Sequence, residues 1–355
     1  MNLCPTALRR QYRASVDADA EQSFRMFDLW RIAGTGYLVA IVMQSQTPQL
    51  QVRLDTEEAE AVLALVELGP RATPQDWQHL FQSAGYRRLQ EREAAIQVPF
   101  TDSAFRAFVL SPTLSRQRGD LRRTLESWRA IRVDGAARRA FQYLPSNARI
   151  RASIYPVIKP RRNTFVWEPR TNPAIFFYLN PAMSAAQFEN TLAHELHHLG
   201  VASACNNDSL PLVQQWMSGF SEGRAMLAAA TDPDVHPHAV SNTSDRATWD
   251  RDFANVARDI QRLEAFFADL ITGALTQEQR NERGFAFVNS TGVPQGPYYT
   301  VGYHMARAIE KRFGRNRLVE STCDPRMFLS DYNHAATAQG LPRWSDAFLQ
   351  KLSSK

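Results

Sequence analysis

The chain has 355 residues, enough to bury a substantial core as one large domain or two. Its 44% hydrophobic and 22% charged residues are ordinary for a globular protein. The net charge is +5, but nearly all the basic residues are arginines scattered among acids, without a dense basic run. This pattern excludes a typical nucleic-acid-binding module and indicates a solvated surface.

The cysteines and the N-terminal region bear on the cellular location of the chain. Cys4, Cys205 and Cys323 cannot all pair, so we expect neither a disulfide framework nor a thiolate zinc site. Residues 1–19 lack the apolar stretch of a leader, and the apolar run Gly36–Met43 is too short to span a bilayer. We therefore expect no membrane span and, by default, a cytoplasmic protein. If a leader has been removed, the protein would instead be extracytoplasmic.

The hydrophobic pattern divides the chain into three predicted zones. Residues 1–54 are irregular with one β-like run, residues 55–145 are helical, and residues 146–355 form a core in which strands precede helices. The helices expected in the second zone are Thr56–Leu68, Thr73–Ala84, Ser103–Leu110, Leu114–Ile131 and Ala136–Tyr143. The strands expected in the third zone are Arg149–Tyr155, Thr164–Trp167 and Ala174–Leu179. The helices expected there are Ser184–Leu199, Leu210–Ala230, Asp252–Leu275, Pro297–Phe313 and Ser345–Leu352. The predicted fold class is α-rich α+β.

The first helix of the third zone contains the motif H-E-x-x-H as His194, Glu195 and His198. Two histidines four residues apart lie on one face of a helix, so both imidazoles can bind one metal ion. The glutamate after the first histidine can hold a water on that metal and accept its proton. The motif arises by accident in roughly one chain in a hundred of this length. Its helical setting favours a zinc hydrolase instead.

Other features of this helix and other histidines have plainer interpretations. Ser184 is the expected N-cap, and Gly200 is expected to end the helix just after the second ligand. His197 points about 100° away from His198 around the helix, so we expect it on the surface or beside a ligand. His236 and His238 stand among prolines and acids, which indicates a surface loop.

A catalytic zinc needs a third protein ligand and an open position for water. The best candidate is Glu222, about two dozen residues after the second histidine in the run S-E-G-R-A. The adjacent Gly223 allows the close backbone approach that a short metal–carboxylate bond requires. The alternative is a solvated helix glutamate paired with Arg224 or with another arginine.

The run H-E-L-H-H followed by S-E-G-R-A resembles the gluzincins, the zincin group whose third zinc ligand is a glutamate. The second run is similar to the N-E-G-x-A motif of the alanyl-aminopeptidase type, but the spacing is longer. Met226 stands where thermolysin carries an aspartate, so another group must orient the ligand histidine. A closer likeness is to bacterial families of zinc-dependent peptidases that carry H-E-x-H-H, S-E-G and Y-x-x-G-Y. This likeness covers the chain from about residue 55.

The resemblance implies a zincin-like core, made of a small mixed sheet, the histidine helix and the glutamate helix. It also implies that one sheet edge lies along the cleft and pairs with an extended substrate. The Y-x-x-G-Y motif is represented here by Tyr299 and Tyr303, four residues apart, which can face the same cleft. Gluzincins commonly use such a side chain to stabilise the oxyanion. For either tyrosine, ordinary aromatic packing is the alternative.

The prediction is therefore a zinc metallopeptidase. His194, His198 and Glu222 hold one zinc ion, Glu195 is the general base and acid, and a tyrosine stabilises the oxyanion. The expected partner is a peptide or protein substrate. Two alternatives remain open: a zinc hydrolase of a non-peptide amide or ester, and a non-catalytic protein with a structural zinc or none. A structural site would need a fourth ligand, for which Cys205 is the nearest candidate.

Overall fold

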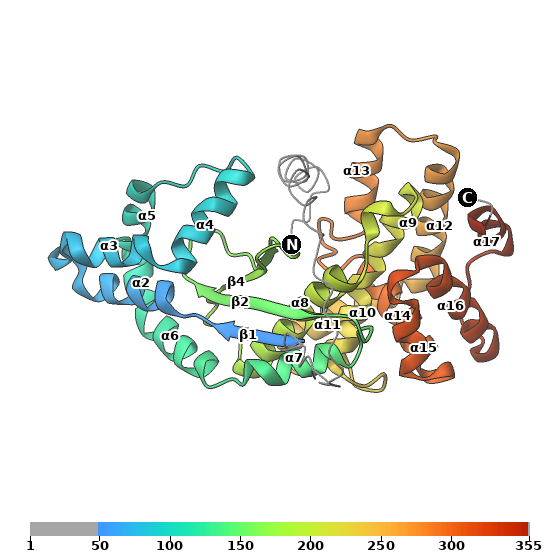
Figure 1. Cartoon of the computed structure of the whole chain (residues 1–355), viewed down its shortest axis with the longest axis horizontal. Helices are drawn as coiled ribbons and strands as arrows, with labels where there is room; N and C mark the ends of the chain where they lie inside the picture. Colours follow the sequence, from blue (N-terminus) through green and yellow to red (C-terminus); the bar gives the residue numbers. More distant parts are fainter. Residues whose placement is uncertain (1–48, 354–355) are drawn as a thin grey trace, which may run out of the picture.

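The computed structural model describes residues 49–353 as two lobes that meet at a long central helix, α8 (Ala185–Ala204). In Figure 1 the first lobe, at the left, holds a small sheet with several helices, and the second, at the right, is built of helices. The fold is α-rich α+β with a small mixed sheet, as predicted. The β-like run expected at residues 36–43 lies outside the described residues.

The chain builds the two lobes in sequence order. The helices before α8 are α2 (Glu57–Leu68), α3 (Pro74–Gln82), α4 (Ala84–Ala95), α5 (Asp102–Val109), α6 (Pro112–Arg129) and α7 (Val133–Phe141). The helices after α8 are α9 (Leu212–Met217), α10 (Ser221–Ala230), α11 (Thr243–Phe253), α12 (Val256–Thr272), α13 (Gln277–Ala286), α14 (Pro297–Phe313), α15 (Arg315–Glu320), α16 (Pro325–Gln339) and α17 (Asp346–Ser353). Short 3₁₀ turns are η1 (Gly69–Arg71), η2 (Asn207–Ser209), η3 (Ser218–Phe220) and η4 (Ser321–Cys323).

One sheet has the strand order β1-β2-β4-β3. The strands are β1 (Leu50–Leu54), β2 (Ile150–Val157), β3 (Phe165–Trp167) and β4 (Ala174–Tyr178). Strands β1, β2 and β4 run parallel, whereas β3 pairs antiparallel with β4 and forms one edge. The three predicted strands are confirmed. Strand β1 falls in the zone predicted to be irregular, because it is specified by pairing with a strand far away in the sequence, which local pattern does not reveal.

Helix α8 begins at the predicted N-cap Ser184, whose hydroxyl accepts a hydrogen bond from the backbone N–H of Gln187 at 3.1 Å. The prediction that Gly200 ends the helix is wrong, since the helix continues to Ala204. A Cβ at Gly200 would lie 2.1 Å from Cδ1 of Leu144. This glycine therefore serves close packing inside the helix and not its termination.

Several boundaries differ from the sequence prediction. The helix expected at Leu210–Ala230 is broken into α9, η3 and α10, so Glu222 lies in the first turn of a separate helix. The helix expected at Asp252–Leu275 is divided between α11 and α12. Helix α4 was not predicted because it follows α3 after only Ser83, whose hydroxyl caps α4.

Helices α8 and α10 lie where two hydrophobic clusters meet. The first cluster joins the sheet, helices α2 to α7 and one face of α8, where Trp128 and Phe188 stack with centroids 4.2 Å apart. The second cluster fills the helical lobe around Phe220 and Phe267. Helix α10 contributes to both clusters, Ala229 to the first and Leu227 to the second. A site between α8 and α10 is thus enclosed by both lobes.

A disulfide joins Cys205, at the end of α8, to Cys323 in η4, across 118 residues of sequence. The expectation that the cysteines form no disulfide framework is therefore wrong for this pair. The three cysteines include one that lies outside the described residues, Cys4. An odd total hid the pair, because sequence alone does not say which two cysteines meet.

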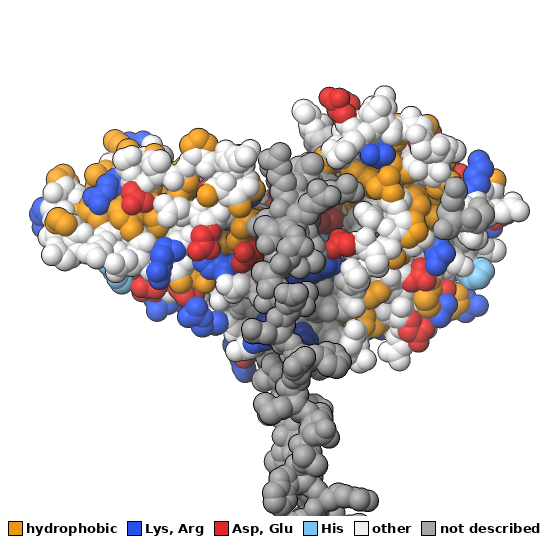
Figure 2. Space-filling view, turned by 45° about the horizontal axis from the view of Figure 1, so that its top comes forward, with side chains coloured by type: hydrophobic (Ala, Val, Ile, Leu, Met, Phe, Trp, Pro, Cys, Tyr) orange, Lys and Arg blue, Asp and Glu red, His pale blue; other side chains and the backbone are white. Residues whose placement is uncertain are grey.

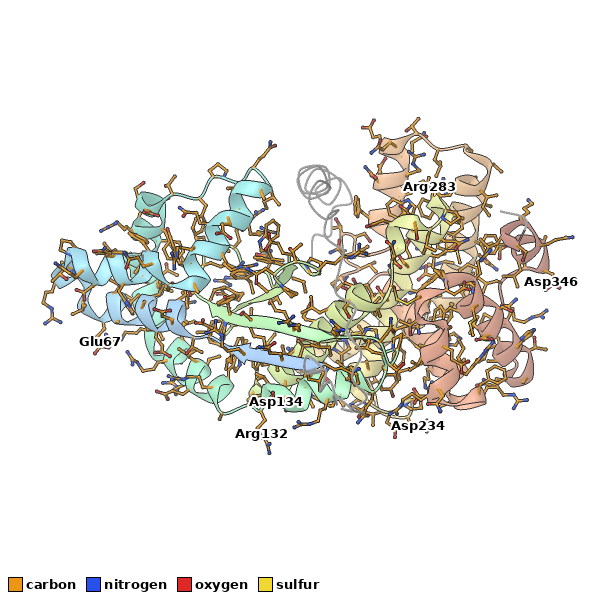
Figure 3. All side chains as sticks on the ribbon, in the orientation of Figure 1. Glu67, Arg132, Asp134, Asp234, Arg283 and Asp346 are labelled. Carbon is orange, nitrogen blue, oxygen red and sulfur yellow. A yellow bond between two sulfur atoms is a disulfide. The ribbon has the colours of Figure 1, made fainter. Side chains whose placement is uncertain are left out.

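The surface carries mixed charge. Figure 2 shows Lys and Arg side chains interspersed with Asp and Glu side chains on one face of both lobes. Charged residues at the periphery include Glu67, Arg132, Asp134, Arg283 and Asp346, all labelled in Figure 3. Within residues 49–353, no helix combines the length and the apolar character needed to cross a bilayer.

Candidate metal centre

Three predicted ligand atoms converge at the junction of α8 and α10. The Nε2 atoms of His194 and His198 lie 3.0 Å apart, and the Oε2 atom of Glu222 lies 3.3 Å from the first and 3.2 Å from the second. His194 and Glu222 are buried, and His198 is nearly so. Among the described residues this is the one group of three or more potential ligands that meets in this way.

These separations fit a zinc ion. Ligand atoms about 2.0–2.2 Å from a tetrahedrally coordinated zinc lie roughly 3.3 Å from one another. Two neutral imidazole nitrogens that both act as acceptors would repel each other at 3.0 Å unless a cation or a shared proton lay between them. The donor set of two imidazoles and one carboxylate is a common one for catalytic zinc.

The charge state of Glu222 suits a metal ligand. Burial alone would raise the pKa of its carboxyl, but His198 and His194 outweigh burial and lower that pKa well below its usual range. The side chain is therefore an anionic carboxylate at neutral pH. The predicted alternative, an exposed glutamate paired with Arg224, does not describe this residue, since Glu222 is buried and Arg224 bonds elsewhere.

Glu195 lies beside the ligands on α8, buried, with Oε1 making no hydrogen bond within the described residues. Burial raises the pKa of its carboxyl, and the neighbouring His194 and His198 oppose that rise. A carboxylate with a raised pKa is a better proton acceptor near neutral pH than an exposed glutamate. A buried oxygen with no hydrogen bond among the described residues, on a side chain in the electrostatic field of His194 and His198, is available to a water or a substrate.

Close contact with α14 determines where α10 lies. A Cβ built on Gly223 would come 2.0 Å from the backbone nitrogen of Tyr303 and 2.2 Å from the carbonyl carbon of Gly302. A Cβ on Gly302 would similarly lie 2.8 Å from the backbone oxygen of Phe220. The two helix backbones can touch only because both positions are glycine. This contact places Glu222, next to Gly223, toward α8.

The two predicted tyrosines have different surroundings. The ring of Tyr299 lies nearly parallel to that of His194, with centroids 6.1 Å apart. Burial and the nearby carboxylates of Glu222 and Glu195 raise the pKa of Tyr299 well above its usual value. The hydroxyl of Tyr303 donates instead to the carbonyl oxygen of Val235 at 3.2 Å. Tyr299 therefore lies at the metal centre, and Tyr303 lies against the loop after α10.

The other histidines have separate places. His197 is buried, which excludes the first of its two expected positions, the surface; its ring lies 6.3 Å from that of His198, which fits the second, beside a ligand. Burial keeps its pKa well below the usual value. His236 pairs with Asp250 at 2.9 Å, and His238 lies 3.0 Å from the hydroxyl of Ser241. Both belong to the loop predicted for them; Asp234 of the same loop, labelled in Figure 3, pairs with Lys311. Neither is among the clustered ligands.

Some groups that bear on the site were not predicted as such. Nδ1 of His194 is buried without a hydrogen-bond partner in the described residues, so the group expected to orient this ligand is not found among them. Arg224, two positions after the glutamate ligand, bonds to the turn that carries Cys323. The sequence offers little sign of that connection. It contains two cysteines besides Cys4, and an arginine within an otherwise alanine-rich helix.

Fold and site define an α+β protein with a buried His-His-Glu metal centre between two lobes. The family model described as “Putative zinc dependent peptidase (DUF5700)” matches residues 77–340, and the chain belongs to this family. No curated protein and no solved structure matches the chain. The predicted cofactor, zinc, is confirmed by the family's description together with the one candidate metal site among the described residues.

Proposed function

We propose that the chain is a zinc metallopeptidase of the gluzincin type, with a zincin-like core. The observation that carries the proposal is the convergence of His194, His198 and Glu222, with separations that suit one zinc ion, beside the buried Glu195. The family match supports a zinc-dependent peptidase in general terms. Zinc bound there would act as a Lewis acid and lower the pKa of a water in its open position to about 7.

The side chains around that position have distinct proposed roles. Oε1 of Glu195, which makes no hydrogen bond to the described part of the chain, accepts the proton of the attacking water and then delivers it to the leaving amine. The hydroxyl of Tyr299, whose ring stacks on that of His194, donates a hydrogen bond to the developing oxyanion. The burial of these groups excludes bulk water and strengthens their electrostatic effects.

A peptide is favoured over other amides by the sheet. Strand β3 (Phe165–Trp167) is an antiparallel edge strand whose second side has no strand partner among the described residues. Such an edge offers backbone N–H and C=O groups to an extended peptide, which would add to the sheet as a further strand. We propose that β3 binds substrate in this way.

A structural zinc is less well supported than a catalytic one. A structural site is normally closed by four protein ligands. Cys205, the nearest predicted fourth ligand, is bonded to Cys323 and cannot supply a thiolate. The described residues provide a cluster of three ligands, which leaves a position for water.

The disulfide also favours the extracytoplasmic alternative for the location of the chain. Disulfides form and persist in oxidising compartments and are rare in the reducing cytosol. The test is to quench cells that naturally make the protein with acid and to determine the thiol state of Cys205 and Cys323. Free thiols at both positions would contradict an extracytoplasmic location.

The decisive variant is Glu195→Gln. We expect peptide hydrolysis to fall by at least about 10²-fold, the lower range for loss of a general base, while one zinc per chain is retained. The measurement combines elemental analysis with cleavage of a peptide library. Glu189→Gln, on the same helix but in a half-buried ion pair with Arg139, is the matched control and should leave turnover unchanged. Parental turnover by Glu195→Gln would refute the mechanism.

A further inference from the structure

Arg224 is a buried arginine with an unusual set of partners. Its guanidinium donates to the carbonyl oxygens of Leu318 at 2.6 Å and Ser321 at 3.0 Å, and to the hydroxyl of Thr322 at 2.7 Å. It also lies over the ring of Phe328, 4.7 Å from the centroid. All three hydrogen-bond acceptors are neutral. Burying a charged guanidinium without a carboxylate partner costs free energy. The three hydrogen bonds offset that cost only while their acceptors stay in fixed positions.

The acceptors belong to the end of α15. Leu318 lies in the last turn of that helix and Ser321 is its C-cap, so their carbonyls are among those that a helix leaves without internal partners. A cation at this end is also favoured by the helix dipole. Arg224 of α10 therefore caps α15 and attaches the glutamate helix to the turn η4.

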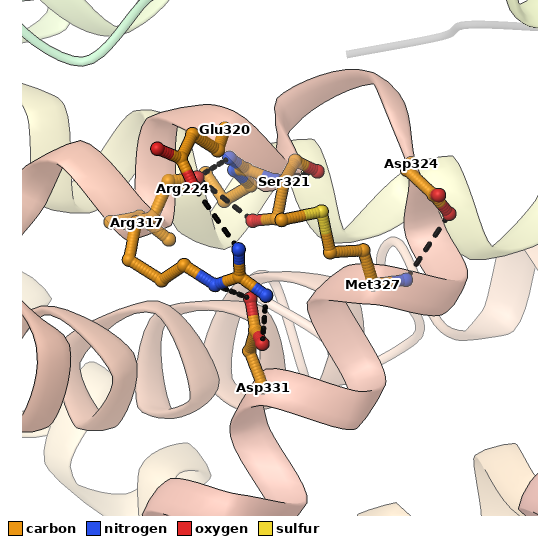
Figure 4. Close-up of polar contacts among 8 residues, drawn as sticks. Arg224, Arg317, Glu320, Ser321, Asp324, Met327 and Asp331 are labelled. Carbon is orange, nitrogen blue, oxygen red and sulfur yellow. Dashed lines mark hydrogen bonds and ion pairs between the residues drawn. The ribbon is translucent and has the colours of Figure 1, made fainter.

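The same turn is attached to the histidine helix. Cys323, the last residue of η4, forms the disulfide with Cys205 at the end of α8. On the other side of the turn, the carboxylate of Asp324 accepts hydrogen bonds from the backbone N–H groups of Arg326 and Met327 and caps α16 (Figure 4). Because the helices on both sides of η4 are capped, the turn has little conformational freedom. The position of α10 is therefore coupled through η4 to the position of α8.

We propose that Arg224 and the Cys205–Cys323 disulfide act together as a brace that sets the distance between the zinc-binding histidines and Glu222. The brace runs from α10 through Arg224 to η4, and from η4 through the disulfide to α8. The metal centre is the third connection, directly between α8 and α10. Arg224 is thus a positioning residue, and the inference rests on the proposed zinc site.

The brace accounts for an otherwise weak point of the centre. Among the described residues, Nδ1 of His194 has no hydrogen-bond partner, so this ligand lacks the usual outer contact that would orient it. Orientation must then come from the helices themselves. A covalent link near the end of α8 and a three-bond clamp two positions after Glu222 supply it.

The test measures the affinity of the metal-free chain for Co²⁺ and the absorption spectrum of the bound Co²⁺, which reports coordination geometry. We expect Arg224→Gln, and separately the double variant Cys205→Ala/Cys323→Ala, to bind Co²⁺ about 10- to 100-fold more weakly, the range for lost outer contacts. Their spectra should also differ from that of the parent. Arg224→Lys should restore only part of the affinity, because an ammonium cannot reproduce the planar fork of a guanidinium.

The matched control is Arg317→Gln. Arg317 lies on α15 next to the brace and bonds to Glu320 and Asp331 (Figure 4), neither of which bonds to Arg224 or belongs to the disulfide. Its loss should weaken packing of the same region while leaving the Co²⁺ affinity within about threefold of the parent. Circular dichroism confirms folding of each variant. If the double cysteine variant does not fold, reduction of the native chain with a phosphine gives the same comparison.

A triple variant separates a brace from two independent stabilising contacts. If Arg224 and the disulfide form one connection, breaking both should weaken Co²⁺ binding no more than breaking either. Effects that multiply, or folded variants with parental affinity and spectrum, would overturn the brace while leaving the metal site intact. A parent chain that binds no Co²⁺ would instead remove the proposed function, so the two failures are distinguishable.

Discussion

Tyr299 and Tyr303 are one turn apart on α14, yet only one hydroxyl is at the metal centre. The ring of Tyr299 stacks on that of the proposed ligand His194, near the carboxylates of Glu222 and Glu195. The hydroxyl of Tyr303 bonds instead to the backbone of Val235. We expect Tyr299→Phe to lower kcat by about 10²- to 10³-fold with little change in zinc content, as for the loss of one oxyanion donor.

Tyr303→Phe provides the comparison for this prediction. It removes the same atom from the same helix but breaks only a contact with a loop, so it should lower kcat by less than about threefold and affect stability by about 1 kcal/mol. Steady-state kinetics on one peptide decide the matter. Equal losses of kcat in the two variants would contradict a special role for Tyr299.

At the level of single residues, local sequence was most informative where chemistry depends on neighbours in one helix. His194, Glu195 and His198 follow from helical periodicity, and the structure brings the two histidines together with Glu222. The third ligand, Glu222, was predicted from its place after the histidines and its neighbouring glycine, and the family resemblance added support, because no periodicity links residues on different helices. The roles assigned to the individual site residues stay predictions.

At the level of elements, the contact of α10 with α14 is a second determinant of the metal centre. We expect Gly223→Ala to reduce the free energy of unfolding by 3 kcal/mol or more, about the upper range for overpacking, because its Cβ would meet backbone atoms 2.0 and 2.2 Å away. To relieve this clash α10 must move away from α14, which should displace Glu222 and lower the zinc content. Urea unfolding and elemental analysis measure the two effects.

Gly119→Ala is the control, since Gly119 lies within α6 and a Cβ there would come no closer than 3.5 Å to a side-chain nitrogen of Arg123. This substitution should stabilise the protein by about 0.5–1 kcal/mol through helix propensity. A Gly223→Ala variant as stable as the parent would mean that α10 and α14 can separate without cost.

Elements were predictable to the extent that their signals are local. Capping residues and proline at the first turn located the starts of α3, α8 and α14 to within a residue or two. The break between α9 and α10 and the strand β1 were missed, because both depend on tertiary contacts. The disulfide was missed for the same reason.

At the level of the whole molecule, the division into zones at residues 54 and 145 stays a prediction. One hydrophobic cluster nevertheless includes side chains from α2, β2 and α8, such as Val62, Ile154 and Leu192. The stability of the sheet, its covering helices and the histidine helix is therefore shared. A substitution among the buried residues of this region should change the free energy of global unfolding.

Glu58 provides such a change, and its ionisation should make stability depend on pH. Burial raises the pKa of this carboxyl to about 8, while a hydrogen bond from the backbone N–H of Ile158 and the nearby Lys159 oppose the rise. Between the unfolded pKa of 4.5 and the folded pKa of about 8, the folded chain keeps a proton that the unfolded chain has released. The stabilisation is therefore complete below pH 4.5 and is lost as pH rises to 8, by up to about 1.4 kcal/mol per pH unit.

Glu58→Gln should remove this dependence, because glutamine is neutral at every pH and can still accept the hydrogen bond from Ile158. We expect urea unfolding from pH 5 to pH 7.5 to show the variant gaining stability relative to the parent as pH rises. Glu57→Gln, exposed on the same helix, should follow the parent throughout. Since ionisation of the distant zinc ligands affects all three chains equally, the difference between chains isolates Glu58. A constant difference across this range would mean that Glu58 is already ionised at pH 5 in the folded protein.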